Sequence, residues 1–198
     1  RHHPIRPRLP AQPVAQKTNG QSVFGYFNLD RITTRGLTAN VTTRPLARLE
    51  LAGGYQFLQA RDRAVVDALA SGTVFGRQPD GTESRLGLAD YGGLFGRSTH
   101  TASLRAMYAT DNASASLRGR WRNRYGYRDL DGNGVANRPD EFVPGYALLD
   151  LTLTRSWNLP AGRLTTQVGA ENLFDVTRGI LVPSLPGRTV FASVGLAL

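Results

Sequence analysis

The chain has 198 residues, of which 40% are hydrophobic and 20% are charged, and it contains no cysteine. This length allows one ordinary domain, and the lack of cysteine excludes a disulfide framework and any Cys-ligated metal or iron–sulfur site. No stretch approaches the roughly 18–20 consecutive apolar residues of a membrane-spanning helix. The sequence therefore excludes the helical class of membrane protein, but not a membrane β-barrel, whose apolar residues alternate with polar ones.

The formal net charge is +9, and Lys17 is the only lysine among 24 basic residues, so 23 are arginine. A basic chain raises nucleic acid as a candidate partner. The chain begins at Arg1, with no Met and no apolar signal region after it. We therefore expect a mature chain or a piece of a longer one.

Proline recurs every third position near the start of the chain, at Pro4, Pro7, Pro10 and Pro13. This spacing predicts a polyproline-like or irregular tail over residues 1–20, without a packed core. A Pro-rich ligand for a docking domain is the functional alternative.

After the tail, apolar residues recur with a period of two, which is the pattern of a β-strand with one apolar and one polar face. In residues 147–155, for example, alternate positions are Ala or Leu, and Asp150 and two threonines stand between them. The same pattern predicts seven strands. They cover residues 37–42 (with a start as early as Val23), 47–58, 100–108, 113–122, 147–155, 163–173 and 188–198.

The links between these strands alternate between short and long. Such a chain forms an all-β, antiparallel up-and-down meander with its long loops at one end, the pattern of an outer-membrane barrel with short periplasmic turns and long extracellular loops. One helix-like stretch, residues 61–70, opens the first long link. The short links are 43–46, 109–113 and 158–162, and the long links are 61–97, 123–145 and 175–187.

Lipid is the simplest cover for the apolar face, because a soluble sheet needs a second layer and one short helix cannot cover seven strands. Charges buried without partners inside a soluble sandwich would each cost several kcal/mol, whereas a water-filled barrel interior keeps them solvated or paired. Aromatic residues at both ends of the strands fit two interfacial girdles. The polar-face charges are Arg48, Glu50, Arg105, Arg118, Arg120, Arg122, Asp150, Arg163 and Glu171, and the girdle aromatics are Tyr55, Phe57, Tyr108, Trp121 and Trp157.

Two motifs then carry a family resemblance over about residues 21–198. The run GAENLFD at 169–175, followed by PGR at 186–188 and a last alternating strand, resembles the end of a TonB-dependent outer-membrane receptor, and the run at 26–37 resembles another strand of that family. The resemblance implies a transmembrane β-barrel in the bacterial outer membrane. It also implies outer-membrane lipid, the barrel-assembly machinery, TonB and a plug domain as partners, and uptake of scarce ligands such as ferric siderophores, cobalamin or sugars.

The chain departs from the family in three respects. It ends at Leu198 where the family ends in an aromatic residue, it carries no plug domain or TonB box, and it supplies about seven of the roughly 22 strands of such barrels. An unclosed sheet leaves bare backbone groups in hydrocarbon, so we expect residues 21–198 to be the C-terminal part of a larger barrel. The alternatives are a small self-contained outer-membrane barrel with a structural or adhesin role, which needs an eighth strand, and a basic nucleic-acid-binding β protein.

A candidate calcium loop lies in the second long link. Asp129, Asp131 and Asn133 stand at the first, third and fifth positions with glycine at the sixth, as in the start of a calcium-binding loop. The twelfth position is Asp140, with Glu141 one place later. The predicted calcium ligands are Asp129, Asp131, Asn133 and Asp140. The alternative is a turn-rich loop that binds no metal.

The polar face offers a candidate ligand site. Arg118, Arg120 and Arg122 form a ladder that would attract an anion such as a ferric siderophore, unless they pair with Asp150 and Glu171 and position the plug. Nearby aromatics would add contact surface: Tyr125, Tyr127, Tyr91 and Phe95.

Other chemistry finds little support in the sequence. The Ala, Leu and Trp residues between the ladder arginines belong to a strand face and not to a stacking platform for single-stranded nucleic acid. His2 and His3 lie in the tail, and His100 lies at a strand end. No nucleophile–base set is recognisable. We therefore expect no enzymatic activity, no resident cofactor and no nucleic-acid partner.

Overall fold

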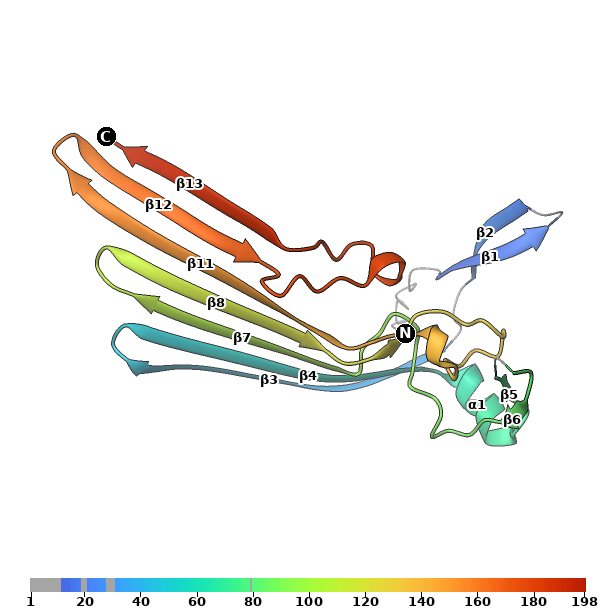
Figure 1. The fold of residues 1–198 in the computed structure, drawn as a ribbon. Coiled ribbons are helices and arrows are strands. Elements are labelled where there is room, and N and C mark those ends of the chain that lie inside the picture. The colour runs from blue at the N-terminus through green and yellow to red at the C-terminus, as the bar shows by residue number, and fades with distance from the viewer. Residues whose placement is uncertain (1–11, 19–20, 28–30, 79) are drawn as a thin grey trace, which may run out of the picture.

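The computed structural model describes residues 12–18, 21–27, 31–78 and 80–198. Its main feature is a seven-stranded antiparallel sheet in which every strand pairs with its neighbours in chain order (Figure 1). This is the predicted up-and-down meander. The strands are β3 (Ile32–Leu46), β4 (Leu49–Asp62), β7 (His100–Ala109), β8 (Ala113–Arg122), β11 (Tyr146–Leu159), β12 (Gly162–Glu171) and β13 (Thr189–Ala197).

Short turns join the strands at one end of the sheet and long links at the other, as the sequence predicts (Figure 1). Most of the small elements lie in the long links. The first holds α1 (Arg63–Ser71), β5 (Phe75–Arg77) and β6 (Glu83–Arg85), the second holds β9 (Tyr125–Gly126), the 3-10 helix η1 (Pro139–Glu141) and β10 (Phe142–Val143), and the third holds the 3-10 helix η2 (Gly179–Leu181).

The predicted start of the first strand at Val23 is wrong. Val23 lies in β2 (Gln21–Phe27), which pairs with β1 (Gln12–Thr18) in a separate two-stranded sheet. Val23 pairs with Gln16 of β1, whereas β3 begins at Ile32, which pairs with Asp62 at the end of β4. β1 thus takes up part of the Pro-rich segment, while residues 1–11, with His2 and His3, lie outside the described residues.

Strand register keeps the apolar positions on one face, which we call the outward face. Leu151 of β11 lies opposite Leu117 of β8 on one side and Ala170 of β12 on the other, and Leu37 lies opposite Phe57 on β3 and β4. Because side chains alternate along each strand, these rows continue across the whole sheet. The face is uncovered, since Leu37 and Val194 are 65% and 73% exposed.

The buried hydrophobic cluster lies in the long links and not on the sheet. It consists of Leu69, Val74, Leu86, Tyr91 and Val135. Helix α1 contributes Leu69 to this cluster and so leaves the outward face bare. None of the helices in the described residues is long and apolar enough to cross a membrane.

Helix α1 begins and ends on signals present in the sequence. The Asp62 side chain accepts a hydrogen bond from the Ala64 N–H at 2.8 Å, as an N-cap does. Gly72 ends the helix in the left-handed conformation, at φ 71°, which glycine adopts without a Cβ penalty. The helix predicted over 61–70 is therefore present, shifted by two residues at its start.

The turn after β12 explains the NLFD motif physically. Asn172 and Asp175 are the only non-glycine residues with positive φ in the described chain, at 48° and 54°. The Asn172 side-chain amide donates to the carbonyl oxygens of Val176 and Pro186, each at 2.9 Å, and its Oδ1 accepts the Val176 N–H. Asp175 Oδ1 accepts the Arg188 N–H at 2.7 Å. Two side chains thus fasten both ends of the last long link.

Two replacements of Asn172 separate the contribution of its positive-φ backbone conformation from that of its side-chain hydrogen bonds. Asn172→Ala places a Cβ residue at positive φ, which costs about 1–2 kcal/mol, and leaves two carbonyl groups unpaired at about 1–3 kcal/mol each when they are buried. Asn172→Gly removes only the hydrogen bonds. We expect both variants to lower the free energy of unfolding of the complete receptor in urea, measured in vesicles, and the glycine variant to retain about 1 kcal/mol more. Equal stability of the two variants would contradict a role for the backbone conformation.

We expect the polar face of the sheet to tolerate an added charge and the outward face not to tolerate one. Leu151→Arg places a guanidinium on the outward face near the middle of β11 and should lower the free energy of unfolding in vesicles by ~2–4 kcal/mol. Thr152→Arg, its neighbour on the polar face, is the matched control and should cost much less, because its side chain reaches the water-filled interior. Equal losses would show that lipid does not cover the outward face.

Candidate functional site

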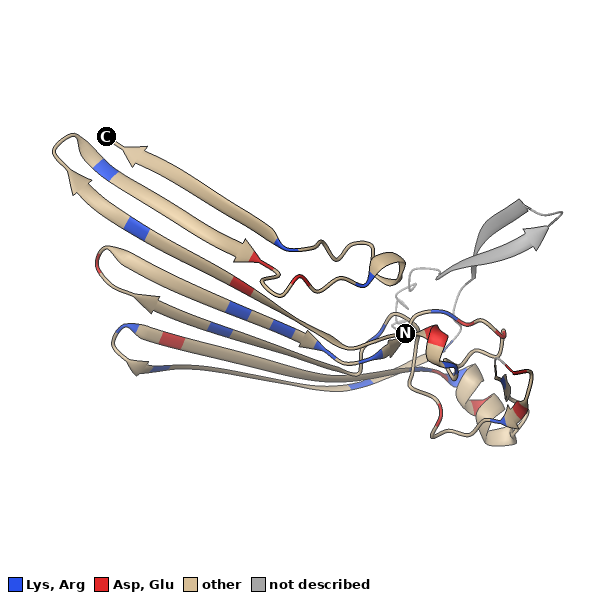
Figure 2. Ribbon diagram, in the orientation of Figure 1, with Lys and Arg blue, Asp and Glu red and all other residues tan. Residues whose placement is uncertain are grey.

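The charges of the polar face gather on β7, β8 and β11 (Figure 2). Register places Arg118 opposite Arg105 on one side and Asp150 on the other. Asp150 nevertheless pairs diagonally, because Arg120 Nη2 donates to Asp150 Oδ2 at 3.2 Å. The second oxygen, Oδ1, accepts the Asn172 N–H at 3.0 Å. Asp150 therefore joins the arginine ladder to the turn that ends β12, whereas Glu171 forms no ion pair within the described residues.

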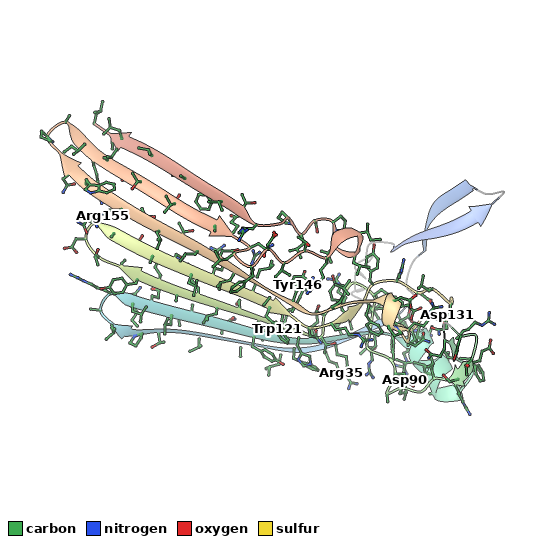
Figure 3. The ribbon with its side chains drawn as sticks, viewed as in Figure 1. Arg35, Asp90, Trp121, Asp131, Tyr146 and Arg155 are labelled. Atoms are coloured by element: carbon green, nitrogen blue, oxygen red, sulfur yellow. The ribbon has the colours of Figure 1, made fainter. Side chains whose placement is uncertain are left out.

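Arg122, at the long-loop end of β8, is fixed by aromatic and hydroxyl groups. Its guanidinium carbon lies 4.1 Å from the centroid of the Tyr125 ring, at cation–π distance. Its Nε donates to Ser98 Oγ at 2.8 Å, and its Nη1 lies 3.5 Å from the hydroxyl of Tyr146. The label of Tyr146 in Figure 3 marks this end of the polar face.

Arg178, from the last long link, completes the group. Its guanidinium carbon lies 5.7 Å from the Tyr146 ring centroid, and its Nη2 donates to the Gly145 carbonyl at 3.0 Å. Its Nε is buried and has no hydrogen-bond partner in the described part of the chain. We call Arg122, Arg178, Tyr125 and Tyr146 the Arg–Tyr cluster. Sequence reasoning missed Arg178 and Tyr146, because no local pattern places a loop arginine against a strand 32 residues earlier.

Burial and charge act in opposite directions on Tyr125. The side chain is 7% exposed, and this burial raises the pKa of the Tyr125 hydroxyl above its ordinary value, while the nearby Arg122 opposes the rise. The hydroxyl therefore stays protonated at neutral pH and remains a hydrogen-bond donor.

Not every predicted ligand residue joins the cluster. Tyr127 is 41% exposed, and its N–H donates to the Glu141 carbonyl at 2.7 Å. Tyr91 is buried in the loop cluster, where its hydroxyl accepts the Asp62 N–H. Of the five candidates, Arg122 and Tyr125 meet in the cluster, Arg120 pairs with Asp150, and Arg118 and Tyr127 stay apart from it.

The candidate calcium loop brings together a different third carboxylate from the predicted one. Oxygens of Asp129, Asp131 and Glu141 lie within 4.8 Å of one another. Asp140 instead forms an ion pair with Arg138 at 2.9 Å. The reason is the backbone of η1: Glu141 is fully buried and accepts N–H bonds from Leu130, Asn137 and Arg138, so its neighbour Asp140 points to solvent.

Most carboxylate lone pairs of this loop are already used. Asp129 accepts the N–H groups of Gly132, Asn133 and Gly134. The Asn133 side chain accepts the Val135 N–H and donates to the Phe75 carbonyl. Among the oxygens of this loop, Asp131 Oδ1 is buried without a hydrogen-bond partner in the described residues. Figure 3 labels Asp131 in the loops. These contacts favour the turn-rich interpretation, and calcium binding stays a prediction.

His100 offers no metal site within the described residues. Its Nδ1 forms a hydrogen bond with the Tyr55 hydroxyl at 2.6 Å, and its ring lies 5.4 Å from the centroid of Phe57. The acidic group of the calcium loop is the only cluster of potential ligands found there, and it does not include His100.

Calcium titration tests whether the loop binds the ion and whether Asp140 takes part. The turn-rich interpretation predicts no heat on addition of millimolar calcium to the protein in detergent. If the loop binds calcium, the heat should be lost in Asp131→Asn and unchanged in Asp140→Asn, because Asp140 is held by Arg138. Burial raises the pKa of Asp129. Protons therefore compete with calcium for Asp129 at a higher pH than they do for an ordinary carboxyl group. Calcium binding should weaken as the pH falls through the raised pKa of Asp129. Absence of heat from the unmodified protein would exclude the site.

Comparison with known proteins supports one assignment. The family model described as TonB dependent receptor-like, beta-barrel matches residues 9–173. Two crystal structures of the ferric enterobactin receptor PfeA from Pseudomonas aeruginosa share the fold, the G324V mutant with a TM-score of 0.57 and the R480A/Q482A mutant with 0.56, both at 16% sequence identity. A search of curated proteins gives no match.

The two receptor structures cover 95% and 94% of this chain, while the chain spans 26% of each of them. An open seven-stranded sheet is what such a share of a large barrel contains. With the family match over most of its length, the chain belongs to the TonB-dependent receptors of the bacterial outer membrane, as part of their β-barrel.

Proposed function

We propose that this part of the barrel contributes to TonB-dependent uptake of a ferric siderophore or a similar scarce anionic ligand. The observation that carries the proposal is the Arg–Tyr cluster, which lies at the long-loop end of the polar face, where a ligand from outside the cell enters the barrel. The family supplies the role of receptor and transporter; the ligand class comes from the chemistry of the cluster.

The cluster combines the groups that a planar anion needs. Guanidinium groups bind anionic oxygens in a bidentate manner and stack on aromatic rings, and Tyr125 and Tyr146 provide both rings and hydroxyl donors. The buried Arg178 Nε has a donor still to satisfy, and an anionic oxygen is its natural partner. The name of the PfeA receptor records ferric enterobactin as that protein's ligand.

Below the cluster, the ladder extends the positive field into the barrel. Of Arg105, Arg118 and Arg120, only Arg120 forms an ion pair within the described residues, with Asp150. A lumen lined with one sign of charge concentrates oppositely charged ligands and raises their rate of entry. In the whole receptor, the plug, TonB, the barrel-assembly machinery and outer-membrane lipid are the partners we propose.

The small self-contained barrel, with a structural or adhesin role, fits the sheet less well. β3 and β13 each have a single neighbour, and the β1–β2 hairpin forms its own sheet, so the described residues provide no eighth strand to close the barrel. Bare strand edges cost several kcal/mol per backbone group in hydrocarbon, which favours neighbouring strands from a larger barrel.

Ligand binding to the complete receptor tests the proposal. We expect Arg122→Ala and Arg178→Ala to weaken binding of a ferric catecholate about tenfold each, since charge-assisted hydrogen bonds are of that strength. Arg163→Ala, at the short-turn end of the polar face, is the matched control. Quenching of intrinsic fluorescence gives the dissociation constants. Unchanged binding in both cluster variants would refute the proposal, and so would tight binding of a neutral ligand in place of the catecholate.

A further inference from the structure

A second group of arginines lies on the other face of the sheet, outside the barrel. Arg35 of β3, Arg61 of β4 and Arg63 of α1 line a cavity of about 210 Å³, and Val66 and Asp67 of α1 form its far wall. We call these three arginines and their cavity the rim pocket. Figure 3 labels Arg35 near the long-loop end of β3.

Strand register places the rim pocket on the outward face. Arg35 lies opposite Gln59, and Thr33 lies opposite Arg61, in an unbroken register with the pair Leu37 and Phe57. Side chains two residues apart point to the same face. Arg35 and Arg61 therefore project from the barrel wall on the same side as the apolar residues that face lipid.

The positive charge of the pocket is largely uncompensated. Arg61 Nε is buried with no hydrogen-bond partner in the described chain, and its guanidinium carbon lies 5.9 Å from the centroid of the Tyr91 ring. Arg63 approaches Asp67 only to 4.0 Å, with both side chains well exposed, and such exposed pairs contribute little. Arg35 forms no ion pair with any described residue.

The apolar surface next to the pocket defines its depth in the membrane. Leu37 and Phe57 follow Arg35 and Gln59 by one step of about 7 Å along the same face, and Tyr55 lies one step further towards the short turns. Tyrosine is typical of the level of the lipid headgroups. The pocket therefore lies two steps beyond this level on the side of the long loops, at the outer border of the headgroups of that leaflet.

We propose that the rim pocket binds the phosphate group of a phosphorylated lipid of the outer leaflet, whose acyl chains extend past Leu37, Phe57 and Tyr55 into the hydrocarbon. Three guanidinium groups give the bidentate donors that a phosphate needs. Arg61 lines the pocket and its Nε has no hydrogen-bond partner in the described chain, and the adjoining apolar face favours a phosphate that belongs to a lipid.

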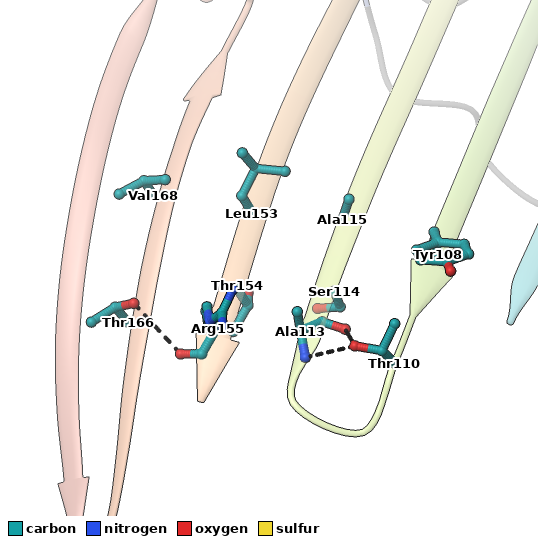
Figure 4. Close-up of a pocket in the computed structure, with 10 residues that line it drawn as sticks. All are labelled: Tyr108, Thr110, Ala113, Ser114, Ala115, Leu153, Thr154, Arg155, Thr166 and Val168. Carbon is teal, nitrogen blue, oxygen red and sulfur yellow. Dashed lines mark hydrogen bonds between the residues drawn. The ribbon is translucent and has the colours of Figure 1, made fainter. Parts of the chain in front are cut away.

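The short-turn end of the outward face provides a matched control. Arg155 is the only charged residue of the outward face in that half of the sheet, and it borders an apolar groove between β7 and β12 lined by Tyr108, Leu153 and Val168 (Figure 4). Its guanidinium carbon lies 5.7 Å from the Trp157 ring centroid. A single arginine in the opposite leaflet should not bind the same headgroup.

Native mass spectrometry of the complete receptor in detergent tests the proposal, with diphosphoryl lipid A as the probe and its dephosphorylated form as the comparison. We expect the phosphorylated lipid alone to remain bound. Arg35→Gln should lower its affinity about tenfold, and Arg35→Gln combined with Arg61→Gln should lower it further. Arg155→Gln should leave it unchanged. Arg35 is exposed and unpaired in the described chain, so its replacement should not disturb folding, which heat-modifiable migration on a gel confirms.

The alternatives give different outcomes. Equal loss in Arg155→Gln would mean non-specific attraction of lipid to arginine and would overturn the proposal. Equal binding of the dephosphorylated lipid would do the same. If inorganic phosphate binds as tightly as the lipid and displaces it completely, the pocket is a site for a free anion, and the role of the apolar face is refuted. Arg61→Lys keeps the charge but not the fork of donors, and should bind with intermediate affinity.

Discussion

The structure depends on one constraint, the pairing of every strand of the sheet with a neighbour while its apolar face stays uncovered. Backbone N–H and C=O groups must find partners inside the sheet when water is absent, and a chain-order meander satisfies them with short turns. The apolar face has no second protein layer, since the buried cluster around Leu69 and Val135 lies in the loops. Hydrocarbon is the cover that this arrangement requires, and the division of the molecule into an outward and a polar face follows from it.

The same constraint places the residues of the proposed ligand site at the long-loop end. Within the sheet, strand register fixes the position of every side chain, because a shift of one residue would move all side chains of that strand to the opposite face. The long links have their own small core and their own buried acid, Glu141, whose oxygens accept three backbone N–H groups. They can therefore hold Tyr125 and Arg178 in fixed places beside Tyr146, at the long-loop end of β11. Asp150 joins the two regions, because one of its oxygens binds Arg120 and the other binds the turn at Asn172.

Features set by local sequence were predictable, and features set by distant contacts were not. The alternation of polar and apolar residues is local, so the seven strands and the helix near Arg63 could be predicted within a few residues. The break between β2 and β3 arises because β2 pairs with β1. The alternation of polar and apolar residues does not show which strand is the partner, so it could not predict this break. Likewise, spacing favoured Asp140 as a calcium ligand, whereas the packing of η1 buries Glu141 and leaves Asp140 to Arg138. Arg178 joined the candidate site through a loop, where the sequence has no periodicity to interpret.

The marked preference for arginine over lysine has a structural explanation on both faces. Five arginines of the described chain lie near aromatic rings: Arg122 on Tyr125, Arg124 on Phe142 at 3.4 Å, Arg155 on Trp157, Arg61 on Tyr91 and Arg178 on Tyr146. A planar guanidinium stacks on a ring and still donates hydrogen bonds at its edge, whereas the compact ammonium of lysine is strongly hydrated and loses more on leaving water. At the boundary between hydrocarbon, headgroups and a water-filled lumen, a cation must be partly dehydrated and yet stay charged. Arginine beside an aromatic ring meets both demands, and an anion that reaches the ring-supported guanidinium finds its donors already oriented.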